Sequence, residues 1–66
     1  MQIVLNGENR EIRDDCSLNE LVKLLNLRED RLAVELNREV VRRKDWPETK
    51  LRAGDRLEVV HFVGGG

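Results

Sequence analysis

The segment Ser17-Leu18-Asn19-Glu20 fixes the start of the one main helix that this sequence predicts. It has the form of a capping box, in which the Ser17 hydroxyl accepts from the amide of Glu20 and the Glu20 carboxylate accepts from the amide of Ser17. Asn26 suits the left-handed position that ends a helix. Between these two signals, apolar residues recur at helical spacing: Leu18, Leu21, Val22 and Leu25. We therefore expect a helix of about two turns with one apolar face.

A hairpin is predicted before this helix. Residues 2–5 are apolar and partly β-branched, and they lead into Asn6-Gly7, a pair that fits a two-residue hairpin turn because both positions tolerate positive φ. Residues 9–13 would form the second arm. Their charged side chains are typical of an edge strand that resists aggregation.

Further strands are predicted after the helix. Residues 32–36 and the short segment 40–41 have strand patterns, and residues 56–63 form the last and longest strand. Trp46-Pro47 interrupts this order. Because Pro47 disfavours the α region at Trp46, we expect an irregular connection in which Trp46 covers the end of the core.

This order of elements predicts an α+β fold of the β-grasp (ubiquitin-like) type, a mixed sheet with one main helix packed on one face. The first and last strands would lie side by side and parallel at the centre of the sheet. We expect residues 1–63 to form the domain. Residues 64–66 would then be a flexible tail that leaves the domain at a corner of the sheet.

The last strand carries candidate docking residues. Leu57, Val59 and His61 share one face with Val63, and Val60 and Phe62 share the other with Glu58, because side chains alternate along a strand. If Leu57 and Val59 face the helix, Val60 and Phe62 lie on the outer face at the root of the tail. An apolar patch there is a candidate docking site for a partner. The alternative is that a loop covers both residues.

Length and composition exclude several function classes. A chain of 66 residues buries only about 60% of its unfolded surface, too little to enclose a cofactor and a substrate pocket together. Neither a nucleophile triad nor an acid and base pair is evident, so a self-sufficient enzyme is not expected. Twelve Lys and Arg balance thirteen Asp and Glu, and Trp46 and Phe62 are the only aromatic residues. This composition does not favour nucleic acid as a partner.

Two single residues could suggest chemistry but fit structural roles better. Cys16 is the only cysteine, so it fits a hydrophobic staple against Leu21 better than a redox site, and it suits a reducing cytoplasm. His61 fits packing at the rim of the sheet, because the chain offers no second His or Cys for a metal. The first residues contain neither a basic leader nor an apolar run long enough for a membrane span. We therefore expect no metal site and no membrane contact.

The three final glycines indicate what the chain does. Glycine has no Cβ, so Gly64 and Gly65 could thread a channel too narrow for other residues and place the Gly66 carboxylate against a bound nucleotide. A carboxylate is a poor electrophile. Such a tail therefore implies a partner that activates it with ATP. The alternative is a disordered terminus or a linker remnant.

Three pieces of the sequence are similar to the ThiS family of sulfur carriers of thiamine biosynthesis. They are the opening MQIVLNGE, the middle VVRRKDW at positions 40–46, and the end LRAGDRLEVVHFVGGG at positions 51–66. The chain departs from the family pattern at Arg42, where the family usually has proline. The resemblance covers nearly the whole chain.

The resemblance implies that the protein is a co-substrate rather than an enzyme, with no cofactor of its own. An activating enzyme would adenylate Gly66 with ATP and magnesium, and sulfur from a cysteine desulfurase would then displace AMP. The resulting thiocarboxylate would donate sulfur to thiazole synthase for the thiamine thiazole ring. Two alternatives stay open: the small sulfur-carrier subunit of molybdopterin synthase, and a ubiquitin-like modifier or binding module.

Overall fold

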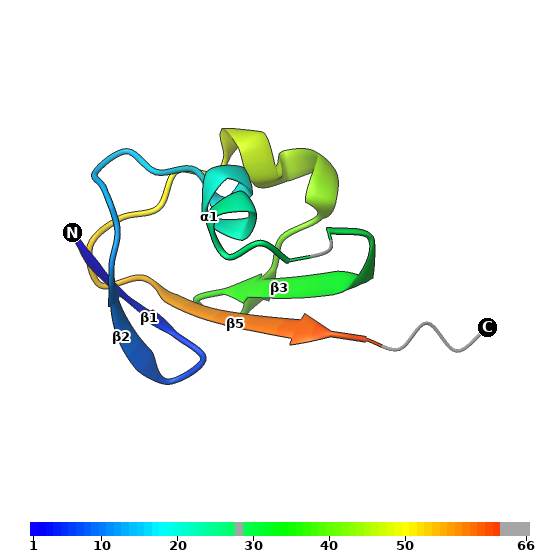
Figure 1. The fold of residues 1–66 in the computed structure, drawn as a ribbon, viewed down its shortest axis with the longest axis horizontal. Helices are drawn as coiled ribbons and strands as arrows, with labels where there is room; N and C mark the ends of the chain where they lie inside the picture. The colour runs from blue at the N-terminus through cyan, green and yellow to red at the C-terminus, as the bar shows by residue number, and fades with distance from the viewer. Residues whose placement is uncertain (28, 63–66) are drawn as a thin grey trace.

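One α-helix lies across a five-stranded mixed sheet in the computed structural model, which describes residues 1–27 and 29–62 (Figure 1). The strand order is β2-β1-β5-β3-β4. β1 and β5 are neighbours and parallel at the centre, while the other pairs are antiparallel. The predicted β-grasp topology is confirmed. The strands are β1 (Gln2–Leu5), β2 (Glu8–Glu11), β3 (Leu32–Leu36), β4 (Glu39–Val40) and β5 (Arg56–His61).

The β1–β2 hairpin forms as its turn residues predict. Asn6 and Gly7 have φ values of 49° and 83°, as a tight two-residue hairpin turn requires. The second arm differs from its predicted bounds, since β2 begins at Glu8 and ends at Glu11. Ile12 leaves the strand to enter the core, where it is buried, and its amide still donates to the carbonyl of Met1 at 2.8 Å.

Helix α1 (Leu18–Leu24) begins and ends where the sequence predicts. The amide of Glu20 donates to the Ser17 hydroxyl at 3.1 Å, and the amide of Ser17 donates to the Glu20 carboxylate at 2.9 Å. Asn26 has a φ of 57°, the left-handed conformation expected after the last turn. Cys16 and Leu21 are both buried, which fits the hydrophobic staple.

The connection between β4 and β5 corrects one prediction. Residues 43–48 form a 3-10 helix, η2 (Arg43–Glu48), with Trp46 and Pro47 inside it. The Trp46 side chain is 1% exposed, and its indole N–H donates to the carbonyl of Val41 at 2.9 Å. This anchoring holds the segment in short i to i+3 turns, which tolerate the missing amide of Pro47 better than a continuous α-helix would. The predicted role of Trp46 in closing the core is confirmed.

Smaller differences accompany η2. β4 begins one residue earlier than predicted, at Glu39, and a short 3-10 helix η1 (Glu29–Arg31) that the sequence did not predict precedes β3. At Arg42, where the ThiS family that the sequence resembles usually has proline, φ is −69°. Proline fixes φ near this value, so Arg42 keeps the backbone path that proline would impose.

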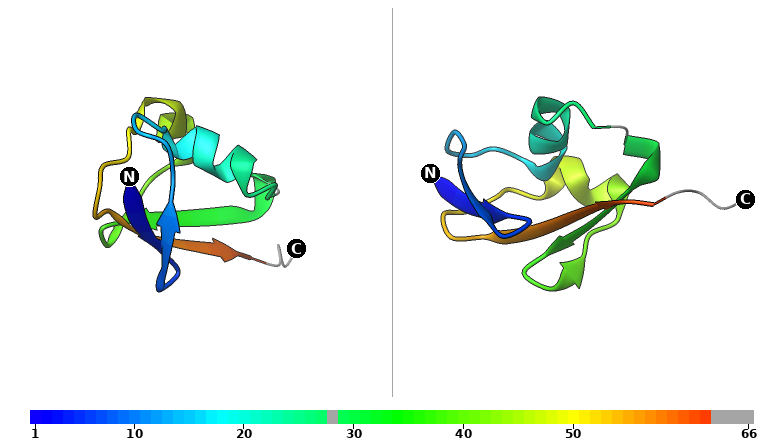
Figure 2. Two further views of the ribbon diagram at one scale, coloured as in Figure 1. Left: turned by 60° about the vertical axis from the view of Figure 1, so that its left-hand side comes forward. Right: turned by 60° about the horizontal axis from the view of Figure 1, so that its bottom comes forward.

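The core lies between the sheet and the two segments above it, α1 and η2 (Figure 2). Its buried apolar residues come from all of these elements and from the loops between them: Ile3, Leu5, Ile12, Cys16, Leu18, Leu21, Val22, Leu32, Val34, Trp46, Leu51 and Leu57. In the part of the chain that the structure describes, no helix lies over the opposite face of the sheet (Figure 2). Among the described residues, no helix is long and apolar enough to cross a membrane.

Candidate functional site at the end of the last strand

The two faces of β5 are assigned as the alternation predicts. Leu57 is 1% exposed and faces α1, and Val59 is partly buried on the same side. Val60 and Phe62 are 56% and 47% exposed. Within residues 1–27 and 29–62 no loop covers them, so the exposure expected of a docking patch is confirmed. Whether a partner binds there stays a prediction.

The outer face changes character along β5. Val60 lies opposite the exposed Ala33, whereas Glu58 lies opposite Glu35. Like charges directly opposite each other on a sheet disfavour the fold slightly. The outer face therefore presents apolar side chains toward the end of the strand, and a pair of carboxylates one step before them.

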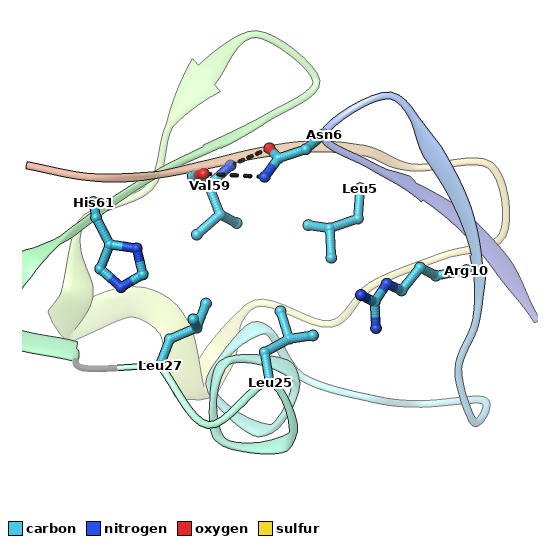
Figure 3. A pocket seen from close by; sticks show the side chains of 7 residues that line it. All are labelled: Leu5, Asn6, Arg10, Leu25, Leu27, Val59 and His61. Atoms are coloured by element: carbon cyan, nitrogen blue, oxygen red, sulfur yellow. Dashed lines mark hydrogen bonds between the residues drawn. The ribbon is translucent and has the colours of Figure 1, made fainter.

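The inner face holds a groove of about 250 Å³ beside the same end of β5 (Figure 3). Its walls come from the sheet on one side and from the residues that follow α1 on the other. Four aliphatic side chains contribute, with one cation and one imidazole at the two ends: Leu5, Leu25, Leu27, Val59, Arg10 and His61, besides Asn6. His61 is thus an exposed residue at the rim of the sheet, as the sequence suggests.

Asn6 connects the hairpin turn to β5. Its side-chain amide donates to the carbonyl of Val59 at 3.2 Å, and its side-chain oxygen accepts from the amide of Val59 at 2.8 Å (Figure 3). The side chain therefore imitates a paired peptide unit and extends the β1–β5 ladder by one step beyond the backbone of β1. A turn asparagine gives no sequence signal for this role, and sequence reasoning missed both the clamp and the groove.

Among the described residues, the pKa values of the Glu20 carboxyl and the Met1 amine are shifted, and both groups stabilise the fold rather than line the groove. Hydrogen bonds from Ser17 lower the pKa of the Glu20 carboxyl from its ordinary value of 4.5. The hydrogen bond to Glu11 raises the pKa of the Met1 amine from 8.0. Residues 1–27 and 29–62 contain no group of three or more His, Cys, Asp or Glu side chains that could hold a metal ion.

The predicted reacting residue and its thread lie outside the described residues. These are Gly66, Gly64 and Gly65, and Val63, the predicted end of the last strand, lies there too. β5 itself ends at His61.

Fold and site together define a class, that of small ubiquitin-like β-grasp domains, with an exposed apolar patch beside the end of the last strand. The family model "ThiS family" matches residues 3–66. This chain therefore belongs to the ThiS family. The crystal structure of a thiamine biosynthesis protein (ThiS) from Geobacter metallireducens superposes with a TM-score of 0.89 at 30% identity, covering 100% of both chains.

Two curated relatives extend the comparison. The sulfur carrier protein ThiS of Bacillus subtilis is 33% identical over 63 residues, which cover 94% of this chain and 96% of that protein. A protein named thiazole synthase from Paramagnetospirillum magneticum is 35% identical over 66 residues. That match covers 100% of this chain but only 20% of the relative, so this chain spans about a fifth of that longer protein.

Proposed function

We propose that this protein is a sulfur carrier of thiamine biosynthesis whose Gly66 is converted to a thiocarboxylate. The observation that carries the proposal is the family match, which continues through the glycines to Gly66 itself. The similarity to the B. subtilis sulfur carrier over nearly all of both chains supports the same function. The protein acts in this proposal as a co-substrate of other enzymes.

The chemistry needs two steps. A carboxylate oxygen of Gly66 attacks the α-phosphorus of ATP, and pyrophosphate leaves as the acyl adenylate forms with magnesium held by the activating enzyme. In the second step the terminal sulfur of a persulfide, formed by a cysteine desulfurase, attacks the carbonyl carbon and AMP leaves; a thiol then cleaves the resulting acyl disulfide, releasing the thiocarboxylate and itself becoming part of a disulfide. The thiocarboxylate that results is a better nucleophile than a carboxylate and delivers sulfur to the thiazole ring.

The outer apolar patch, Val60 and Phe62, supplies the docking surface for the activating enzyme, the thiazole synthase or both. A tail of glycines carries almost no side-chain information, so recognition must come from the domain. Exposed apolar residues beside the end of β5 are suited to that role, because a small central cluster of such residues often carries most of the binding free energy.

The experiment uses intact mass. The protein is incubated with a ThiS-activating enzyme, ATP, magnesium and a sulfur source, and we expect a mass increase equal to the difference between a sulfur and an oxygen atom. The control variant carries one extra residue after Gly66 and should show neither this increase nor ATP–pyrophosphate exchange. A modifier would instead appear in larger conjugates. Normal exchange by the extended variant would contradict the proposal.

A further inference from the structure

The backbone of His61 lies at an open edge of the central strand. On the side of β1, the Leu57 carbonyl accepts from the amide of Asn6 at 2.8 Å, and the Asn6 side chain satisfies both backbone groups of Val59. Alternate residues of a strand point their N–H and C=O groups to the same side. The N–H and C=O of His61 therefore also point to the β1 side of β5. They lie beyond the end of the β1–β2 hairpin, so no backbone of the hairpin faces them. Within residues 1–27 and 29–62, neither group makes a hydrogen bond.

The other side of the strand is occupied. Phe62, the next residue, donates its amide to the carbonyl of Arg31 at 3.0 Å, so the pairing with β3 continues to the end of β5. The open edge is thus confined to one side. It begins where the Asn6 clamp ends, next to the groove on the inner face.

We propose that this edge receives an extended segment of thiazole synthase, which pairs with the backbone of His61 and places an apolar side chain into the groove. Strand addition of this kind gains affinity from backbone hydrogen bonds and specificity from pockets for alternate side chains. The groove supplies such a pocket, since Leu25, Leu27 and Val59 are all partly buried in its walls.

The charges around the groove define the incoming segment further. Arg10 is exposed at one end and makes no ion pair with any residue in the described ranges, and none of the described residues that line the groove is a carboxylate. If the partner segment carries a carboxylate next to its apolar side chain, that carboxylate can form an ion pair with Arg10. The occupant is therefore an extended acidic and apolar segment.

Thiazole synthase is the favoured source of this segment because of the longer relatives. Two proteins with that name contain a stretch similar to this whole chain within one polypeptide. The assignment rests on the proposed function. It uses the inner edge of β5, whereas the docking patch of Val60 and Phe62 lies on the outer face.

The test compares three variants for binding to a purified bacterial thiazole synthase. His61→Pro removes an amide that makes no internal hydrogen bond, and the preceding residue is already extended, so the fold should keep its melting temperature. We expect the dissociation constant to rise about five- to tenfold, the effect of one lost hydrogen bond. His61→Ala keeps the amide and should bind like wild type. Arg10→Ala should weaken binding about threefold or more.

Hydrogen exchange gives an independent readout in the unmodified protein. Free, the His61 amide should exchange rapidly, while the Val59 and Phe62 amides are protected. Addition of thiazole synthase should slow exchange at His61. Unchanged exchange there, normal binding by His61→Pro, or equal weakening by His61→Ala would overturn the proposal. Protection by the activating enzyme alone would overturn its assignment to thiazole synthase. Thiocarboxylate formation by His61→Pro is measured separately by intact mass. This measurement tests the proposed function independently of binding to thiazole synthase.

Discussion

At the scale of single residues, Trp46 is the largest fully buried side chain in the core of this small domain. Its ring is buried in the core, and its indole N–H donates to the Val41 carbonyl. The same contact holds η2 in place over the core. A domain of 66 residues has few other side chains of this size.

We expect Trp46→Ala to cost about 3–5 kcal/mol of unfolding free energy, because it removes a large buried ring and leaves a cavity. Trp46→Phe should cost less, chiefly through the unpaired Val41 carbonyl, at about 1–3 kcal/mol. Urea unfolding measures both values. Leu24→Ser is the control, since Leu24 is 68% exposed and its replacement should change stability little. Equal stability of Trp46→Ala and wild type would contradict the role of Trp46 as a core residue.

The proposed role of the glycine tail can also be tested at a single residue, Gly65. Gly65→Val adds a branched Cβ to the proposed thread and should block passage through a narrow channel. We expect ATP–pyrophosphate exchange with the activating enzyme to fall to background, with no change in melting temperature. Normal exchange by this variant would mean that the channel has room for side chains. Gly66 could then still be the reacting residue, but glycine would not be required at positions 64 and 65.

Among the elements, α1 is the one whose start is fixed most clearly by a local sequence motif, the capping box. The capping box satisfies two backbone amides at a helix of seven residues, a length at which a helix needs support from its ends and from packing. The Glu20 carboxylate has two partners, because it accepts from the Ser17 amide and also forms an ion pair with Arg13. This arrangement makes the first turn of α1 sensitive to acid.

The pH dependence follows from the lowered pKa of Glu20. Because its folded pKa lies below the ordinary 4.5, Glu20 adds stability above pH 4.5, and that contribution disappears as the pH falls through the folded pKa. Glu20→Gln keeps an oxygen for the Ser17 amide but cannot titrate. We expect this variant to lose less stability than wild type when unfolding is measured above and then below pH 4.5. An identical acid dependence for both proteins would contradict this assignment.

The whole molecule presents two proposed docking surfaces, one on each side of β5. The outer face carries Val60 and Phe62, and the inner side carries the groove and the open edge at His61. Both lie at the end of the central strand. Under the proposed function, each partner enzyme would contact a different face of the same strand.

Replacing both Val60 and Phe62 with Ser tests the outer face. If they form a hot spot, partner binding should weaken by about 2 kcal/mol or more. The melting temperature should change little, because both side chains are about half exposed in the free protein. Calorimetry with each partner measures the first effect, and thermal unfolding the second. Unchanged affinity for both partners would remove these residues from the docking surface.

Local signals in the sequence determined most of the fold. The capping box, the Asn6-Gly7 turn and the alternation along β5 each act over a few residues, so the hairpin, the helix and the strand faces could be predicted from neighbours in the chain. These elements in their order also predicted the β-grasp topology. The chemistry proposed at Gly66 came from the family resemblance.

Only the tertiary structure decided the rest, because it depends on residues far apart in sequence. Residues 43–48 form η2 because the Trp46 ring reaches the core and Val41, contacts that outweigh the local preference set by Pro47. Asn6 and Val59 are 53 positions apart, and the contact between them extends the β1–β5 pairing as far as Val59. The next backbone groups on that side, those of His61, lie beyond this contact, and no pattern in the sequence indicates that open edge.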